Sequence, residues 1–491
     1  MRWKCLGYLL SCLVLFVAGV RAQTKKGPIL SFDKLTDQPL LIGVSKLRPV
    51  GDSCYYVVHS IKISGNKKTK SAIILREMSL APGDTLYSSD MNAVLEEKKQ
   101  YLLNTSLFLN AQVFPIDIGN HEIDVEVDVI ERWYFFAFPI LSLADRNFNV
   151  WWVQEHHRLN RLNYGVKVYE NNLSGENDRL EVNLQSGYTQ AYSVHYTLPY
   201  FDKKLKEGMG LFISYWQNHE LNYKSANNKQ VFFKQNYYLK KELQAGIQYT
   251  YKRAIRLQHQ INITFHSFHV NDTVLKLNPD FFPNQINTQR YLELSYEFQY
   301  VGTDFWRYPL TGYYLDAVLD QKGLGIWSPI HETQFSMDAS KYWRLARNTY
   351  LAIDFRGKMH FPKNQPYFLL KEMGYSDDYL QGLEYYVIES DKFGILKANV
   401  KQQLMAMRAH TRLLPKQFST IPFRVYFKLF GDLGYSHNTD PATLSRLNNR
   451  LLYSYGAGVD IVTFYDIIFR MEYSFNQLGE NGLFLHFQSS F

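Results

Sequence analysis

The end of the chain decides the fold: residues 464–491 read FYDIIFRMEYSFNQLGENGLFLHFQSSF. Up to residue 475, apolar and mostly polar side chains alternate. One file is Tyr465, Ile467, Phe469, Met471, Tyr473 and Phe475, and the other is Asp466, Ile468, Arg470, Glu472 and Ser474. Because successive residues of a β-strand point to opposite faces, this stretch needs an apolar and a polar environment at once. A soluble sandwich supplies both environments, and so does a barrel wall in lipid.

A second alternating run follows the turn at residues 477–482. Its apolar side is formed by Leu483, Leu485, Phe487 and the last residue, Phe491, while His486, Gln488 and Ser490 face the other way. An aromatic residue that ends such a run is typical of outer-membrane barrels, whose strands alternate apolar and polar side chains. We therefore predict that these four apolar residues belong to the closing strand of a transmembrane barrel.

The composition agrees with a barrel. Tyrosine and phenylalanine contribute 37 and 33 of the 491 residues, more than a soluble core needs, and barrels place such residues in girdles at both membrane interfaces. The mean hydropathy of −0.29 is too low for a helical membrane protein but suits strands that line a polar lumen. The net charge of +8 is spread along the chain without a basic block, which favours solvated loops over nucleic-acid binding.

The first 22 residues predict a signal peptide. Residues 1–4 are positively charged, residues 5–20 are apolar, and residues 20–22 have the small-residue form of a cleavage site. A lipoprotein-type site at Cys12 is disfavoured because the apolar run continues beyond it. Cys54 would then be the one cysteine of the mature chain, which excludes an intrachain disulfide and a cysteine-based metal cluster.

The chain after the signal peptide divides into three parts. Residues 23–53 show little periodicity and predict a tether. Residues 54–131 predict a small α/β domain with the order β-α-α-β-β. Its predicted strands cover 56–63, 107–115 and 122–131, with helices starting after Thr69 and after Ser88 or Ser89.

Residues 132–491 consist of alternating segments separated by turn-rich connections. At roughly 10 residues per spanning strand plus turns and loops, they suffice for on the order of 16 strands. A sheet edge cannot stay open in lipid, so the predicted fold is mainly β, an antiparallel transmembrane β-barrel preceded by the small α/β domain. A secreted soluble β-sandwich for glycan binding is the alternative.

The small domain resembles a POTRA domain, the periplasmic module of the outer-membrane assembly and bacterial surface-antigen superfamily of the BamA/TamA type. The matching stretches are 61–66 with Thr69, 82–84, 107–108 and 125–131. Gly65 and Asn66 form the POTRA turn. The resemblance implies sheet edges and a helix groove to which an extended peptide can add as a further strand. The alternative is that the domain only braces the barrel entrance.

Two stretches of the barrel resemble the same superfamily. Residues 427–435 look like its Phe-x-Asp-x-Gly strand segment, with Asp432 on the acid and Gly434 on the glycine. Residues 379–388 resemble its inward-folded loop. The resemblance implies that an Arg-Gly-aromatic motif of this loop reaches the lumen-facing aspartate and pins the loop inside the barrel.

The loop motif departs from the family pattern, since it reads Gln381, Gly382 and Leu383. A glutamine can hydrogen-bond a carboxylate, but it lacks the charge and the planar fork of arginine. We expect the loop to fold inward and to be held more weakly. Met373-Gly374-Tyr375 is a second possible alignment, and Asp432 is left with Arg424, Lys428 or Lys397 as candidate partners.

No motif supports an enzyme, a cofactor or a metal site. A Gly-x-Ser-x-Gly elbow, a His-Glu-x-x-His pair and a phosphate-binding loop are absent from the sequence. Residues 155–157 (Glu-His-His) and 377–378 (Asp-Asp) favour solvated turns.

The resemblance implies a protein in the outer membrane of a Gram-negative bacterium, with the POTRA domain in the periplasm. It would assist insertion of outer-membrane proteins or translocation of polypeptides. Implied partners are outer-membrane lipids, unfolded outer-membrane or secreted polypeptides, and periplasmic proteins or lipoproteins. The alternatives are a passive or gated pore for solutes or lipids, and an accessory subunit of a larger complex.

Overall fold

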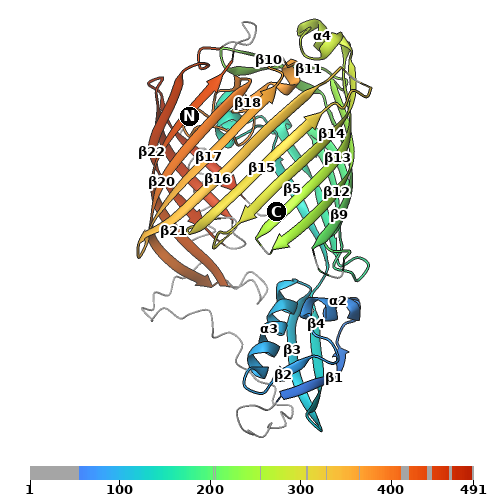
Figure 1. Ribbon diagram of the computed structural model, residues 1–491. Helices are drawn as coiled ribbons and strands as arrows, with labels where there is room; N and C mark the ends of the chain where they lie inside the picture. The colour runs from blue at the N-terminus through green and yellow to red at the C-terminus, as the bar shows by residue number, and fades with distance from the viewer. Residues whose placement is uncertain are drawn as a thin grey trace.

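The computed structural model describes residues 55–202, 204, 206–254, 256–305, 308–327, 329–363, 365–410, 420–438, 445–463 and 467–488. The expected signal peptide (1–22), the tether (23–53), residues 464–466 and Phe491 lie outside the described residues. A small α/β domain stands below one end of a wide barrel (Figure 1).

The small domain is a four-stranded sheet with two helices. Its elements are β1 (Tyr55–Ser64), α2 (Ser71–Met78), β2 (Thr85–Tyr87), α3 (Met91–Asn104), β3 (Phe108–Gly119) and β4 (Glu122–Glu131). The sheet order is β2-β1-β4-β3, with β1 and β4 parallel and the other pairs antiparallel. The predicted order lacked β2, because three residues are too few to show an alternating pattern.

The helix starts differ from the predicted caps. Lys70 precedes α2 and Asp90 precedes α3, and neither side chain caps its helix. The hydroxyl of Thr69 instead lies 3.1 Å from Tyr134 Oη and accepts a hydrogen bond from Asn172 Nδ2 at 2.9 Å. Thr69 therefore ties the domain to the start of the barrel.

The core of the small domain lies between the helices and the sheet. Ile123, Val125 and Val127 of β4 are fully buried, and they pack with Ile74 and Met78 of α2. The alternation of β4 reflects this packing, since its apolar file faces the core and its acidic residues lie on the other face of the sheet.

The barrel wall is one sheet of 16 strands, which confirms the predicted fold class. The strands are β5 (Phe135–Leu143), β6 (Leu162–Asn171), β7 (Arg179–Gly187), β8 (Thr189–Leu198), β9 (Glu207–Asn218), β12 (Lys240–Ala254), β13 (Leu257–Val270), β14 (Thr288–Val301), β15 (Gly312–Lys322), β16 (Glu332–Ala346), β17 (Thr349–Phe361), β20 (Lys392–His410), β21 (Thr420–His437), β22 (Leu451–Val462), β23 (Ile468–Asn476) and β24 (Asn481–Gln488). Neighbours in the wall are antiparallel.

Smaller elements lie in the connections. They are the hairpin β10 (Glu220–Ala226) and β11 (Lys229–Lys234), the pair β18 (Lys371–Met373) and β19 (Ile388–Glu389), the helix α4 (Asp272–Leu277), and the short turns η1 (Val150–Gln154), η2 (Leu159–Arg161), η3 (Pro283–Gln285) and η4 (Tyr367–Leu369). In the described parts of the chain, no helix has both the length and the apolar character to cross a membrane.

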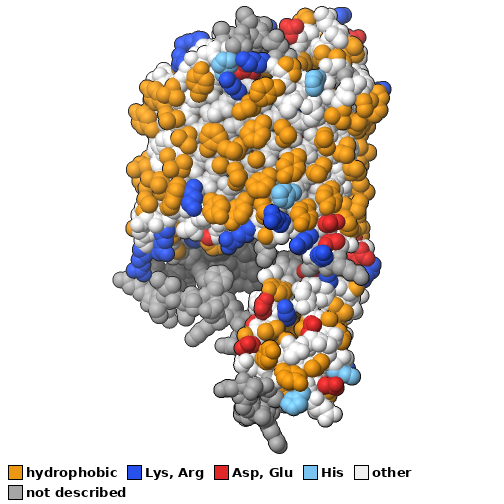
Figure 2. Space-filling model, viewed as in Figure 1, with side chains coloured by type: hydrophobic (Ala, Val, Ile, Leu, Met, Phe, Trp, Pro, Cys, Tyr) orange, Lys and Arg blue, Asp and Glu red, His pale blue; other side chains and the backbone are white. Residues whose placement is uncertain are grey.

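The outer surface of the wall is apolar. A broad band of hydrophobic side chains covers the face seen in Figure 2. Around the wall, Ile213, Ile247 and Leu429 are each about half exposed. On β23, Tyr473 and Phe475 point outward, while Glu472, Ser474 and Asn476 are buried inside. A continuous apolar band of this kind requires lipid around it. The alternative of a soluble sandwich is therefore wrong, because its apolar faces would lie between two sheets.

Direct contacts join the small domain to the turn between β6 and β7. The backbone N–H of Lys70 donates to Gly175 O at 3.0 Å, and the Lys70 ammonium lies 2.6 Å from Glu176. Lys68 pairs with Glu170 at the end of β6. These contacts fix the small domain beneath one side of the barrel.

Candidate functional site: the inward loop and the seam

Residues 365–391, between β17 and β20, fold into the lumen and are called the inward loop below. Its tip is almost fully buried: Leu380, Gln381 and Glu384 are 1%, 5% and 1% exposed. The β10–β11 hairpin lies at the end of the barrel that is farther from the small domain (Figure 1). It holds the inward loop through two hydrogen bonds: the backbone N–H of Val387 donates to Asn228 O, and Asn228 Nδ2 donates to Val387 O.

Gln381 binds two strands of the wall at once. Its backbone N–H donates to Asp432 Oδ2 on β21 at 2.8 Å, and its side-chain Nε2 donates to Glu472 Oε1 on β23 at 2.6 Å. The structure thus brings Gln381 and Asp432 together through the backbone, while the side chain is used for a second carboxylate. Sequence reasoning had paired the side chain with Asp432.

Two glycines allow the loop to approach the wall closely. Gly382 has φ +87°, and a Cβ there would lie 2.8 Å from Ser474 Cβ. Its carbonyl accepts a hydrogen bond from Asn476 Nδ2 at 2.8 Å. A Cβ on Gly434 would lie 2.7 Å from Leu380 Cδ1. Both positions therefore favour glycine for steric reasons, and at Gly382 the backbone conformation favours it as well.

Leu383 lies in an apolar cluster between the loop and the wall. Its partners in this cluster include Leu380, Phe393, Ile395 and Leu452. A leucine fills the position that carries an aromatic residue in the family motif.

The three candidate cations have other contacts. Lys428 pairs with Glu472, and Lys397 and Arg424 lie over aromatic rings. Among the described residues, none of the three comes within ion-pair distance of Asp432. The Gln381 N–H is therefore the donor that the structure gives to Asp432.

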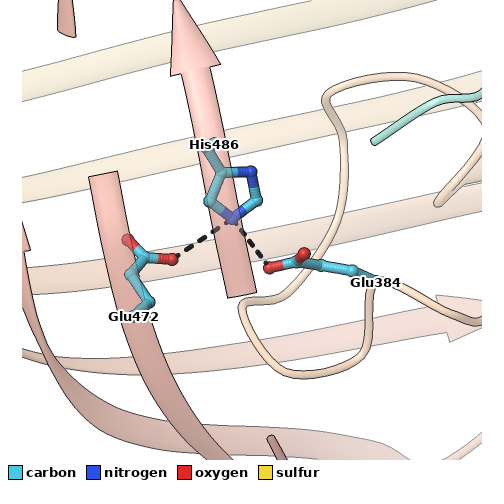
Figure 3. Close-up of side chains that lie close together, drawn as sticks. All are labelled: Glu384, Glu472 and His486. Carbon is cyan, nitrogen blue, oxygen red and sulfur yellow. Dashed lines mark ion pairs between the residues drawn. The ribbon is translucent and has the colours of Figure 1, made fainter. Parts of the chain in front are cut away.

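A second buried cluster joins the loop to the last two strands. His486 Nε2 on β24 lies 3.2 Å from Glu384 Oε1 in the loop and 3.5 Å from Glu472 Oε2 on β23 (Figure 3). Alternation in the sequence had put Glu472 and His486 on inward faces, but nothing in it indicated Glu384. Glu384 lies 88 positions before Glu472 and 102 positions before His486, so no spacing rule links it to them.

The loop is also held by the segment that follows β5. Arg146 Nη1 donates to Gly374 O at 2.8 Å, and Asn147 Nδ2 donates to Glu384 O at 3.2 Å. The inward loop therefore contacts both the beginning and the end of the barrel wall.

The junction of β5 and β24 is called the seam below. Within the described residues the sheet order ends at these two strands, with no ladder between them. The buried side chain of Asn149, shortly after β5, meets the edge of β24. Its Nδ2 donates to Leu483 O at 2.6 Å, and its Oδ1 accepts from Leu485 N at 2.9 Å. One amide thus makes a pair of bonds that a neighbouring strand would otherwise make.

Three of the apolar residues expected on the closing strand, Leu483, Leu485 and Phe487, lie in the described part of β24. Leu483 and Phe487 are 53% and 68% exposed, and Leu485 is half-buried. A cavity of about 1390 Å³ lies beside the seam, lined by lumen residues and by exposed residues of β5 and β24. Its lining includes Tyr379, Lys397, Arg470 and His486.

In the small domain, the turn after β1 requires its glycine. Gly65 has φ +84°, and a Cβ there would lie 1.9 Å from Val129 O. Asn66 Nδ2 donates to Thr69 O at 2.9 Å, which closes the turn. This turn brings the chain from β1 back over the end of β4.

The two other clusters considered in the sequence lie in different places, one on an exposed turn and one in the inward loop. His156 and His157 are exposed residues of a turn with positive φ. Asp378 forms an ion pair with Arg356, with Oδ1 and Nη1 3.4 Å apart.

The fold and the site define a class: a β-barrel of the outer-membrane type that carries one small α/β domain and a plugging loop. Two family models match the chain, the POTRA model, described as "Surface antigen variable number repeat", over residues 56–132 and the Omp85 superfamily domain over residues 172–382. Residues 56–132 thus match the POTRA family and residues 172–382 match the Omp85 superfamily domain, in agreement with the superfamily that the motifs resemble.

A solved structure shares the fold, and two further ones match with lower scores. BamA from Haemophilus ducreyi lacking POTRA domains 1–3 matches with a TM-score of 0.58 and 15% identity, covering 88% of this chain and 83% of that one. CdiB from Acinetobacter baumannii matches with a TM-score of 0.49 and 12% identity over 88% and 73% of the two chains. CdiB from Escherichia coli matches with 0.46 and 10% over 92% of each. No curated protein sequence matches the chain.

Proposed function

We propose that this protein resides in the outer membrane of a Gram-negative bacterium and assists insertion of outer-membrane proteins or translocation of polypeptides across that membrane. The observation that carries the proposal is the seam, where the edge of β24 meets the side chain of Asn149 in place of a strand. The POTRA domain would lie in the periplasm.

The seam suits exchange with an extended polypeptide. An intramolecular hydrogen bond contributes about 0.5–1.5 kcal/mol net, so the two bonds from Asn149 are a modest barrier to a competing strand. A client strand would form several such hydrogen bonds with the edge of β24, including those to the backbone of Leu483 and Leu485. Among the residues that the structure describes, opening at the seam therefore needs no ladder of the barrel wall to break.

The POTRA domain offers a second edge. β3 is the outer strand of its sheet and exposes Leu109, Phe114 and Ile118. An unpaired edge with apolar side chains is the surface to which an extended peptide adds by β-augmentation. A client could thus be held at the POTRA domain before it reaches the seam.

A disulfide lock tests the proposal. One cysteine on β5 and one on β24, introduced in a Cys54→Ser background, would join the seam covalently. We expect the lock to abolish function in cells depleted of the natural protein, measured as loss of other barrel or surface proteins from the outer-membrane proteome. Reduction should restore function.

The matched control is a lock between strands that are already paired. Tyr455 of β22 and Phe475 of β23 are direct partners on the outer face. A Tyr455→Cys, Phe475→Cys disulfide should leave function intact. Full function with the seam locked would contradict the seam mechanism.

A pore for small solutes is the second candidate, favoured by the lumen cavity of about 1390 Å³. The inward loop borders this cavity with Asp377 and Tyr379. Planar-bilayer recordings distinguish the two functions: large steady openings would indicate a pore, and closed or flickering behaviour would agree with the seam proposal.

A further inference from the structure

We infer that Glu384, Glu472 and His486 form a binding site for a divalent transition-metal ion, with Zn²⁺ as the best-suited type. The three residues come from the inward loop, β23 and β24, and their side chains converge (Figure 3). Their potential ligand atoms all lie within 4.8 Å of one another. Imidazole nitrogen and carboxylate oxygen are both ordinary zinc ligands.

The separations match ligands around one ion. His486 Nε2 lies 3.2 Å from Glu384 Oε1 and 3.5 Å from Glu472 Oε2. Ligand atoms placed 2.0–2.1 Å from a tetrahedral zinc ion are about 3.3 Å apart, whereas a charge-assisted hydrogen bond would be about 2.7–2.9 Å long. Neither contact has hydrogen-bond geometry, so the imidazole nitrogen points between the two carboxylates.

An unpartnered buried carboxylate is a second, independent sign of a cation. Glu384 is 1% exposed, and neither of its oxygens has a hydrogen-bond partner among the described residues. Its one ion-pair contact there is His486. A carboxylate removed from water without hydrogen bonds is strongly destabilising unless a cation lies beside it.

The surrounding residues orient the ligands as metal sites require. Glu472 Oε1 is occupied by Gln381 Nε2 and by Lys428, which leaves Oε2 directed at His486. The other ring nitrogen of His486, Nδ1, lies 3.4 Å from Tyr379 Oη. Such outer contacts commonly fix the tautomer and orientation of ligands.

An ion can reach the site from the lumen. His486 and Tyr379 line the cavity of about 1390 Å³ beside the seam. Three protein ligands leave a fourth position for water or for the second oxygen of Glu384. A bound ion would join the inward loop to both of the last two strands, and this role does not depend on any client.

Zinc titration of the full chain, untagged, in detergent and treated with a chelator, tests the inference by calorimetry. We expect one Zn²⁺ per chain, with affinity reduced at least about tenfold by Glu384→Gln and by His486→Gln. His437→Gln is the matched control, because His437 lies on β21 and pairs with Asp391 away from the cluster. It should bind zinc like the natural protein.

X-ray absorption of the zinc-loaded natural protein gives a readout that needs no variant. We expect nitrogen and oxygen ligands at about 2.0–2.1 Å with the signature of one imidazole. Lack of stoichiometric binding, a shell without imidazole, or unchanged affinity in folded His486→Gln would overturn the inference. The cluster would then be a protonated imidazole between two carboxylates.

Discussion

At the scale of single residues, the inward loop depends on close approach. Gly382 rests against Ser474 of β23, and its positive φ is a conformation that other residues adopt only with strain. Gln381 and Asn476 add hydrogen bonds on either side of it. Backbone shape and neutral donors therefore hold this part of the loop against the wall.

Gly382→Ala should loosen the inward loop. The left-handed backbone alone costs about 1–2 kcal/mol with a Cβ, and the clash with Ser474 adds to this. Limited proteolysis between residues 372 and 391 should become faster. Gly479→Ala is the matched control, since Gly479 has φ +79° but no atom within 4 Å of an added Cβ. Equal protection of the loop in both variants would contradict the steric argument.

The sequence could name only part of the site. Asp432, Gly434 and Gln381 were found because each stands in a short motif, and the structure places them in or beside one contact network. Glu384 carries no such signal, because its partner His486 lies on the last strand of the wall. Contacts between distant strands depend on the register of the whole sheet, which short patterns do not specify.

At the scale of elements, the side chains of each wall strand alternate between the outer, lipid-facing surface and the lumen. On β12, Ile247 is 53% exposed on the outer face, and the next residue, Gln248, points inward and donates to Gln260 Oε1. The alternation that predicted strands in the sequence is this same division.

Ile247→Lys should destabilise the barrel in lipid, and Gln248→Lys should not. A lysine on the lipid face costs about 2–4 kcal/mol near the bilayer midplane, while a lumen position remains hydrated. Unfolding of the protein in lipid vesicles by urea would measure both. Equal loss of stability would mean that the band around Ile247 does not face lipid.

A carboxylate organises the start of α2 in the POTRA domain. Glu131 at the end of β4 accepts hydrogen bonds from the backbone N–H groups of Lys68 at 3.0 Å and Thr69 at 2.6 Å. Partial burial raises the pKa of Glu131, but these hydrogen bonds outweigh it and lower the pKa below the ordinary value of 4.5. Because the folded pKa is the lower one, the stabilisation is complete above the unfolded pKa and is lost as the pH falls through the folded pKa.

Acidification should therefore release the Thr69 amide. Hydrogen exchange at Lys68 and Thr69, corrected for intrinsic rates, should be constant above about pH 5 and accelerate below pH 4. Glu131→Gln should remove this step. Glu126→Gln is the control, since Glu126 on the same strand lies beside Lys62 instead. If exchange at Lys68 and Thr69 still accelerated below pH 4 in Glu131→Gln, another group would be responsible for the acceleration.

At the scale of the whole molecule, the POTRA domain has a fixed place under the barrel. Lys68 and Lys70 both contact the β6–β7 end, and Gly175 comes so close that a Cβ there would lie 2.4 Å from Lys68 O. The position of the β3 edge relative to the seam is set by this contact.

Gly175→Ala should free the POTRA domain. Backbone strain at φ +84° and the clash with Lys68 O both oppose docking. The distribution of distances between a spin label on α3 and one on β16 should become broader. Gly83→Ala is the control, because Gly83 has φ +94° but nothing within 4 Å of an added Cβ. An unchanged distance distribution would mean that other contacts hold the domain.

The architecture itself was predictable in most respects. Alternation over residues 132–491 and the α/β order of residues 54–131 predicted a barrel with a small domain. The docking of Thr69 onto Asn172 was missed because a threonine before a helix is read as a cap. The contacts of Thr69 with Tyr134 and Asn172 outweigh its local preference for capping the helix.

The Asn149 contact has a consequence for how the barrel assembles. It joins residues 334 and 336 positions apart, whereas the wall is otherwise built from strands that are near neighbours in the chain. In an unfolded chain, closing so long a loop costs about 3 kcal/mol more than closing a ten-residue hairpin. The hairpins should therefore form early, and the junction of β5 and β24 should close last. Thermal agitation would undo these steps in reverse, so the same junction is the natural first point of opening.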